Sequence, residues 1–186
     1  MDDNRLKTRG YLLFISCVIA TAVSVADDTL EIEQMINDFS SEQLAFYEAV
    51  VLYDFAIGKS PLGDYAFKTC ATPSEPYMPH LSWLMALYGE PDFNNENVLT
   101  AMQVMIDNGC DIDDHQHAGM SPLHEAILLK HDKVIEFLLL NGADKKDLIN
   151  RPGQKSDQLN AIEFAHLLYE TTGMNAYLEL VELLED

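Results

Sequence analysis

The sequence predicts an all-α fold, built as a stack of short helix pairs, from three observations. Apolar residues recur at helical spacing on both sides of a break at His131–Asp132. A serine and a proline precede the first apolar stripe, and Asn141–Gly142 follows the second. A similar segment, Asn108–Asp111, lies 33 residues before Asn141–Asp144. Two helices of about ten residues each bury too little apolar surface to fold alone, so such units must stack.

The segment 119–144 shows this pattern in most detail. Ser121 is the expected N-cap, and Pro122 stands at the first helical position, where its missing N–H costs nothing. Leu123, Ala126 and Ile127 then form the apolar face of a first helix. The stripe of the second helix consists of Val134, Ile135, Phe137, Leu138 and Leu139.

These residues resemble an ankyrin repeat, whose pattern is G-x-T-P-L-H-x-A, then G-H, V-V-x-L-L-L and G-A-D. The positions that match in register are Gly119, Ser121, Pro122, Leu123, His124, Ala126, His131, Val134, Ile135, Phe137, Leu138, Leu139, Gly142, Ala143 and Asp144. Lys130 replaces the glycine that usually ends the first helix, so we expect a less sharp end there. The resemblance implies a curved stack with hairpin fingertips along one edge. It also implies a function in binding proteins, with no chemistry and no cofactor of its own.

The chain then divides into a leader, a cap and three repeats. We expect a signal peptide at 1–26, an N-terminal helical cap at 27–79 and ankyrin-like repeats at 80–186 (80–116, 117–150 and 151–186). The first repeat would place a helix at His80–Tyr88, and the third is degenerate, with extra residues in the loop 145–160. The cap includes the helical stretch 29–58 and a Pro-rich loop, Thr72–Pro79.

The first 26 residues are typical of a secretory signal peptide, with a basic start, an apolar run and small residues at Ser24–Ala26. A transmembrane anchor is the alternative, but the run of about fifteen residues is short of the ~20 that span a bilayer. A lipoprotein at Cys17 is less favoured, because the apolar run continues past it. We therefore expect a periplasmic protein whose mature chain begins at Asp27 and has no membrane attachment.

The net charge of the chain is −20, from 11 Lys and Arg and 31 Asp and Glu. Removing the leader takes away three basic and two acidic residues, which leaves 8 against 29 and a net charge of −21. This excess of negative charge argues against nucleic acid and against an anionic membrane surface as binding partners. It favours a protein partner with a basic surface, or serves solubility alone.

Cys70 and Cys110 remain in the mature chain, and an oxidising compartment would permit a disulfide between them. The alternative is that both are small buried thiols, since spacing does not show that they approach one another.

The segment Asp111–His117 has the character of a metal site, because it holds two imidazoles and three carboxylates. Asp113, His115 and His117 would be the ligands. We favour instead a fingertip that contacts a protein partner, because one hairpin rarely brings three or four zinc ligands together. That fingertip comprises Asp113, Asp114, His115, Gln116, His117 and Met120. His124 is expected to be structural, and the sequence contains no pattern that indicates an enzyme.

Leu128 and Leu129 occupy two positions that the family leaves variable and exposed on the concave side. They form an apolar contact site for a partner, together with Glu125, or they pack on the loop 145–160 or on Trp83. Exported ankyrin-like proteins of this size resemble two groups, immunity proteins against toxins such as type VI secretion effectors, and accessory proteins of enzymes such as catalases. We favour an immunity protein, because an acidic field speeds capture of a basic toxin. Metal binding through Asp111–His117 is the third hypothesis.

Overall fold

The computed structural model describes residues 41–62, 67–72, 78–115 and 118–185. The expected signal peptide at 1–26, the first part of the cap at 27–40, and Gln116 and His117 lie outside these residues. The chain divides into two compact units, Met1–Leu44 and Ala45–Asp186, and the helix pairs all lie in the second unit. Among the described residues, no helix combines the length and the apolar character needed to cross a membrane.

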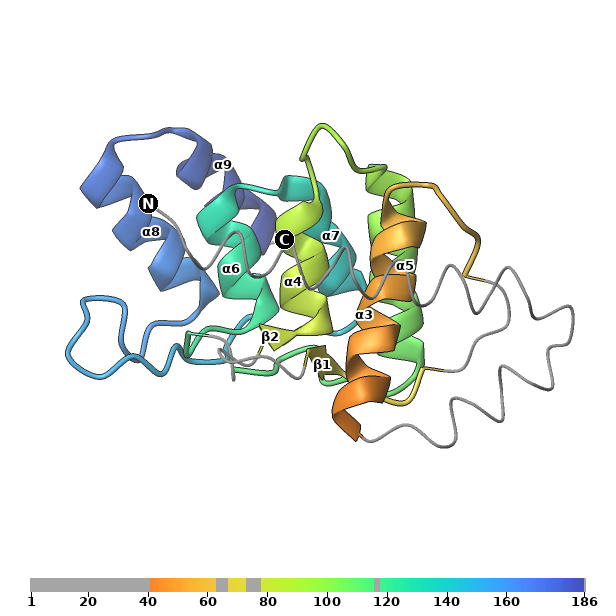
Figure 1. Ribbon diagram of the computed structural model, residues 1–186. Helices are drawn as coiled ribbons and strands as arrows, with labels where there is room; N and C mark the ends of the chain where they lie inside the picture. Colours follow the sequence, from red (N-terminus) through yellow and green to blue (C-terminus); the bar gives the residue numbers. More distant parts are fainter. Residues whose placement is uncertain (1–40, 63–66, 73–77, 116–117, 186) are drawn as a thin grey trace, which may run out of the picture. The chain divides into compact units, whose positions relative to one another are not determined.

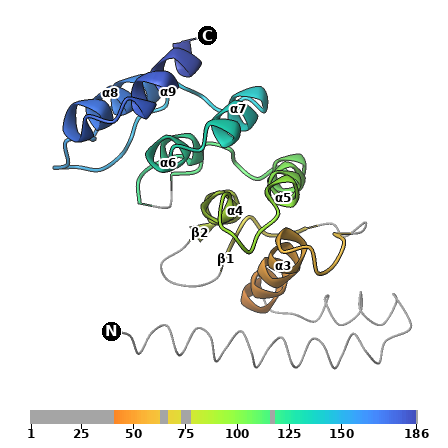
Figure 2. The same ribbon diagram turned by 90° about the horizontal axis from the view of Figure 1, so that it is seen from above.

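The second unit is a stack of three helix pairs, and the predicted all-α class is confirmed (Figure 1). Figure 2 shows α4, α6 and α8 along one side of the stack and α5, α7 and α9 along the other. We call α4, α6 and α8 the first helices and the other three the second helices. The elements are α3 (Ser41–Ala56), β1 (Ala71–Thr72), β2 (Met78–Pro79), α4 (His80–Leu87), α5 (Asn95–Asp107), α6 (Pro122–Leu129), α7 (Asp132–Leu140), α8 (Ala161–Thr172) and α9 (Ala176–Glu185).

Polar residues fix where these helices begin. The Asn94 side chain accepts hydrogen bonds from the backbone N–H groups of Glu96 and Asn97, at 2.9 and 3.2 Å, and so caps α5. Asn160 and Glu163 form a reciprocal capping box at the start of α8. Ser121 holds the N-cap position of α6, but its hydroxyl bonds the His124 ring instead of a backbone N–H group.

The end of α6 is sharper than we expected from the missing glycine. Lys130 itself adopts the left-handed conformation, with φ 60° and ψ 40°, and its N–H bonds the carbonyl of Ile127. The family's glycine conformation is therefore kept without glycine. A left-handed non-glycine residue costs about 1–2 kcal/mol, which the packing of the two flanking helices must offset.

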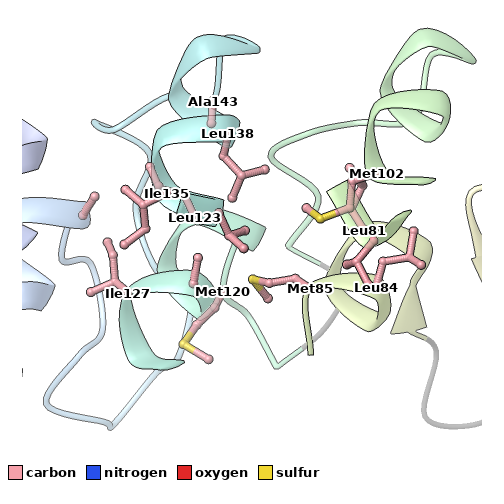
Figure 3. Close-up of a cluster of buried hydrophobic side chains, with 14 of the residues drawn as sticks. Leu81, Leu84, Met85, Met102, Met120, Leu123, Ile127, Ile135, Leu138 and Ala143 are labelled. Atoms are coloured by element: carbon pink, nitrogen blue, oxygen red, sulfur yellow. The ribbon is translucent and has the colours of Figure 1, made fainter. Parts of the chain in front are cut away.

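The core runs between the helix pairs without interruption. Figure 3 shows Leu81, Leu84 and Met85 of α4 in one cluster with Leu123 and Ile127 of α6, and the Met85 side chain points from α4 towards α6. All five side chains are 1% exposed or less. Full burial of such a side chain stabilises the fold by about 1.5–3 kcal/mol relative to an exposed one. Because neighbouring helix pairs share this core, a single pair alone would leave its apolar face exposed.

One feature of the cap was not predicted. Within the segment 72–79, expected to be a loop, Thr72 and Met78 pair as part of a two-stranded antiparallel ladder, in which Ala71 also faces Pro79. The ladder leads directly into α4, where the N–H of His80 donates to the carbonyl of Cys70 at 2.7 Å. Strands of two residues carry no alternation of polar and apolar residues, so the sequence gives no signal for them.

Two further links fasten this region to the stack. Cys70 and Cys110 are joined by a disulfide, with their Cα atoms 5.4 Å apart. The buried carboxylate of Glu48, on α3, accepts hydrogen bonds from the backbone N–H groups of Lys68 and Thr69 at 2.6 and 2.8 Å, and from the Thr69 hydroxyl. The segment 68–70 is thus held to α3 and to the loop that follows α5.

Candidate protein-binding surface

A row of leucines crosses the three first helices, at the carboxyl ends of α4 and α6 and in the middle of α8. We define this leucine row as Leu87 of α4, Leu128 and Leu129 of α6, and Leu167 and Leu168 of α8. Leu128 and Leu129 are 38% and 41% exposed, and the other three side chains are half-buried against the core. A surface with this apolar character is a candidate site for a protein partner.

The row follows from the register of the helices. Helices α4 and α6 both have eight residues, so Leu87 and Leu129 are each the last residue of a helix. Helix α8 begins 39 residues after α6, and this shift aligns Leu167 and Leu168 with Leu128 and Leu129. Helix α6 contacts both α4 and α8, so the leucine row spans three helices that pack side by side.

Exposed carboxylates border the leucine row. Glu90 follows Leu87 by three residues, Asp132 follows Leu129 by three, and Glu170 follows Leu168 by two. All three side chains are exposed. These residues lie at the edge of the stack where each first helix turns towards its partner, which we call the turn edge. An apolar centre with a charged rim is the usual composition of a protein interface.

Tyr177 of α9 fixes the end of α6 below this surface. Its hydroxyl donates to the carbonyl of Leu128 at 3.3 Å, and the Lys130 Nζ lies 5.3 Å from the centre of the Tyr177 ring. Trp83, which we considered as a packing partner for the two leucines, stacks instead on Tyr53, with ring centres 6.4 Å apart. Leu128 and Leu129 thus remain accessible on a backbone that is held in place.

The opposite edge, which we call the finger edge, carries the loops that precede α4, α6 and α8 (Figure 1). Here the Asp113 carboxylate accepts the backbone N–H of Asp144, with distances of 3.1 and 3.2 Å to its two oxygens. The Nε2 atom of His115 is hydrogen-bonded to the Asp147 carboxylate. Two residues that we expected to contact a partner therefore bind the next loop of the same chain.

The acidic character of this edge shows in the pKa of Asp113. Burial raises the pKa of this carboxyl, and the negative charges of Asp147, Asp111 and Asp144 raise it further, while the hydrogen bond from the Asp144 backbone opposes the rise. Asp111 is the exposed member of this group, and Asp113 and Asp114 are half-buried. The described fingertip therefore offers a partner chiefly Asp111 and part of Asp114.

Two other expected contact residues require correction. Met120 and Glu125 are 5% and 6% exposed, respectively. Met120 packs in the hydrophobic core (Figure 3), and the Glu125 side chain on α6 is buried. A partner cannot reach either side chain without opening the stack, so we withdraw both. Gln116 and His117, which belong to the same expected fingertip, lie outside the described residues.

His124 is fully buried beneath the finger edge. Its Nδ1 atom lies 2.8 Å from the Ser121 hydroxyl, and its ring packs edge-on against Phe164 of α8. Burial lowers the pKa of His124 to about 4, while Asp147 opposes this shift. The imidazole is therefore neutral at pH 7. It links the loop before α6 to the next helix pair and has no access to a substrate.

The described residues do not support the metal hypothesis. Within that part of the chain, no three His, Cys, Asp or Glu side chains are grouped so that they could hold a metal ion. Asp113 and His115, two of the three expected ligands, are engaged with Asp144 and Asp147.

The connection between α7 and α8 has 20 residues, compared with 14 between α5 and α6. Part of it folds back on itself and forms what we call the long finger, residues 147–158. Ile149 donates to the carbonyl of Leu159 at 3.0 Å and accepts from Gln158 at 2.8 Å, while the Arg151 N–H donates to Asp157 at 2.9 Å. The sequence showed the extra length, but not that the segment is ordered.

The long finger rests on the preceding loop through its backbone. Asn150 donates its N–H to the carbonyl of Gly119 at 2.8 Å. A Cβ atom on Gly119 would lie 2.0 Å from the Asn150 carbonyl oxygen, so only glycine permits this contact. Within the long finger, the side chain of Ile149 is completely buried. In the sequence, Gly119 was interpreted only as a matching position of the ankyrin pattern, so its contact with Asn150 was not predicted.

The paired helices, the shared core and the loops along one edge define a helical repeat protein. The family model for the ankyrin repeat matches residues 118–151, which contain α6, α7 and the base of the long finger. This stretch is an ankyrin repeat, and the fold is of the ankyrin type. Ankyrin repeats mediate binding to other proteins and are typically non-catalytic. No curated protein and no solved structure matches the chain significantly.

Proposed function

We propose that this chain is an exported immunity protein, which binds a basic toxin in the periplasm and blocks its active site. The observation that carries the proposal is the leucine row with its rim of exposed carboxylates. Leu128 and Leu129 would enter an apolar depression of the toxin, while Glu90, Asp132 and Glu170 pair with basic residues around it.

The charge of the whole chain supports a basic partner. A net charge of −20 creates a field that draws a basic protein towards the surface and raises the association rate, most strongly at low salt. The leucines would then set the lifetime of the complex, because buried apolar contacts mainly slow dissociation. The proposal therefore assigns capture to the acidic rim and retention to the leucine row.

The test combines capture with variants. The exported protein serves as bait for the products of neighbouring genes, at low and then at high salt, and captured proteins are assayed for toxicity after export into cells. We expect one stoichiometric toxin, whose toxicity the protein relieves. A captured enzyme that gains stability and is not inhibited would instead show an accessory protein.

A matched pair of variants locates the binding surface. Leu128→Ser with Leu129→Ser removes the exposed part of the leucine row and should weaken binding at least tenfold. Leu140→Ser, on α7 and 87% exposed, removes a more exposed leucine from a second helix and should leave binding unchanged. Equal effects of the two changes, or no effect of either, would contradict the assignment.

A further inference from the structure

The long finger together with its base, residues 145–160, carries a net positive charge in an otherwise acidic chain. The segment 145–155 holds Lys145, Lys146, Arg151 and Lys155, which are four of the 11 Lys and Arg residues of the chain. The finger and its base, 145–160, contain only two acidic residues, Asp147 and Asp157. The sign of the local charge is therefore opposite to that of the surrounding protein.

The two acidic residues are already engaged, and two of the lysines are not. Asp147 pairs with His115, and Asp157 accepts the backbone N–H of Arg151. Lys145 donates to the carbonyl of Leu184 at 2.7 Å, at the end of α9. Lys146 and Lys155 are exposed, and no carboxylate of the described residues forms an ion pair with either.

The finger is also held rigidly enough to present this charge at a fixed place. Its two sides pair at Ile149 and Gln158, its turn is bonded from Gln154 to Arg151, and its base is bonded to Gly119. The tip, residues 152–155, is exposed throughout. An ordered loop loses little conformational entropy on binding, which favours its use as a contact element.

A cationic tip is unfavourable against a uniformly basic partner, because like charges brought together across an interface oppose binding. From this charge pattern we propose that the long finger enters an acidic recess of the basic protein that the rest of the chain binds. Carboxylates inside a cleft of a basic enzyme have this arrangement, and the paired carboxylates of glycoside hydrolases are the leading case. This inference rests on the proposed function and assigns the finger to the cleft of the toxin.

Two basic proteins of similar size serve as probes, because their clefts differ in charge. The cleft of c-type lysozyme holds carboxylates, whereas that of ribonuclease A holds imidazoles and a lysine. Binding of the full exported chain to each is measured by calorimetry at about 10 mM ionic strength, where the screening length is about 30 Å. Neither probe is the natural partner, so failure here leaves the test of the leucine row intact.

The variants separate local from overall charge. Lys146→Glu with Lys155→Glu changes the net charge of residues 145–160 from 4 − 2 = +2 to 2 − 4 = −2. Lys59→Glu with Lys133→Glu makes the same change in the net charge of the chain at exposed lysines elsewhere. Added negative charge at a distance should strengthen binding to both basic probes. We expect the finger variant, relative to the control variant, to bind lysozyme at least tenfold more weakly and to bind ribonuclease A as tightly or more tightly.

Parallel behaviour of the two variants towards both probes would overturn the inference, as would a failure of the wild-type chain to bind lysozyme at low salt. Circular dichroism melts of each variant check that the fold is kept. Addition of a chitin trisaccharide, which fills the lysozyme cleft, should reduce the affinity of the wild-type chain and leave that of the finger variant unchanged. Equal reduction of both affinities would also count against insertion of the finger.

Discussion

The Cys70–Cys110 disulfide joins residues 40 apart and connects the segment before β1 to the loop after α5. Replacing both cysteines by alanine should destabilise the fold without changing its helix content. Alanine suits the position of Cys110 sterically. Cys110 is 7% exposed and stands where the ankyrin pattern has alanine, so the main loss is the cross-link itself.

The magnitude follows from the length of the closed loop. In the chain-entropy model, a loop of 40 residues removes about 13 cal/mol/K from the entropy of the unfolded chain. At 25 °C this corresponds to about 4 kcal/mol of stability. That amount is a large share of the ~5–15 kcal/mol by which proteins of this size are stable.

Urea denaturation followed by circular dichroism measures this difference. The midpoint of the double alanine variant should fall by about 2 M if the slope is ~2 kcal/mol/M. Reducing agent should lower the midpoint of the wild-type protein to the same value and leave the variant unaffected. A loss below about 1 kcal/mol would refute the reasoning, because it would mean that the unfolded chain gains little freedom from the open loop.

Three further predictions concern single residues. Gly119→Ala should cost about 2–4 kcal/mol, because φ is +68° and the new Cβ would meet the Asn150 carbonyl oxygen, and chemical denaturation measures the loss. Glu48→Gln should lower the stability by about 2 kcal/mol, because both carboxylate oxygens accept hydrogen bonds and the amide nitrogen of glutamine cannot accept one. The same denaturation series measures this loss. Stability should fall as the pH drops below 6.5, because the unfolded chain protonates His124 while the folded chain, with a pKa of about 4, does not. The loss from this residue between pH 7 and pH 5 is about 2 kcal/mol, measured as the difference between wild type and His124→Asn.

Each of these predictions has a control. Gly153→Ala places alanine at a similar φ of +83° in open space, so it should cost only ~1–2 kcal/mol, and an equal loss at both glycines would contradict the role of Asn150. Glu163→Gln changes a capping carboxylate that is exposed, so it should lower the stability less than Glu48→Gln does. Parallel pH profiles of wild type and His124→Asn would show that His124 does not cause the acid sensitivity, and His80, whose pKa burial also lowers to about 4, would be the next candidate.

The helix pairs could be predicted from the sequence because each carries its own signals. Ser121 and Pro122 mark the start of α6, and Asn141–Gly142 marks the end of α7. The left-handed conformation of Lys130 could not be predicted, because lysine rarely adopts it and nothing else in the sequence indicates it. The ladder of β1 and β2 was missed because strands of two residues are too short to show an alternation of polar and apolar residues.

The candidate site was predictable only in part. Leu128 and Leu129 stood out because leucine is unusual at exposed positions, and both are exposed in the structure. Met120 was taken for a fingertip residue, although its side chain packs in the hydrophobic core. The carboxylate of Asp113 also turns to the neighbouring loop. Which way a loop side chain points depends on contacts that sequence spacing does not contain.

The links between neighbouring loops lie along one edge of the stack. The disulfide joins Cys70 of the cap to the first repeat, and the Asp113–Asp144 hydrogen bond joins the first repeat to the second, both at the finger edge. A linear array of repeats that is fastened along one side deforms by rotation about that side. Small rotations between the first and second repeats would change the spacing between Leu87 and Leu128, whereas the hydrogen bond from Tyr177 to the Leu128 carbonyl limits rotation between the second and third. The finger edge would then act as a hinge line between the first two repeats, and the proposed contact surface would adapt to a partner chiefly at its Leu87 end.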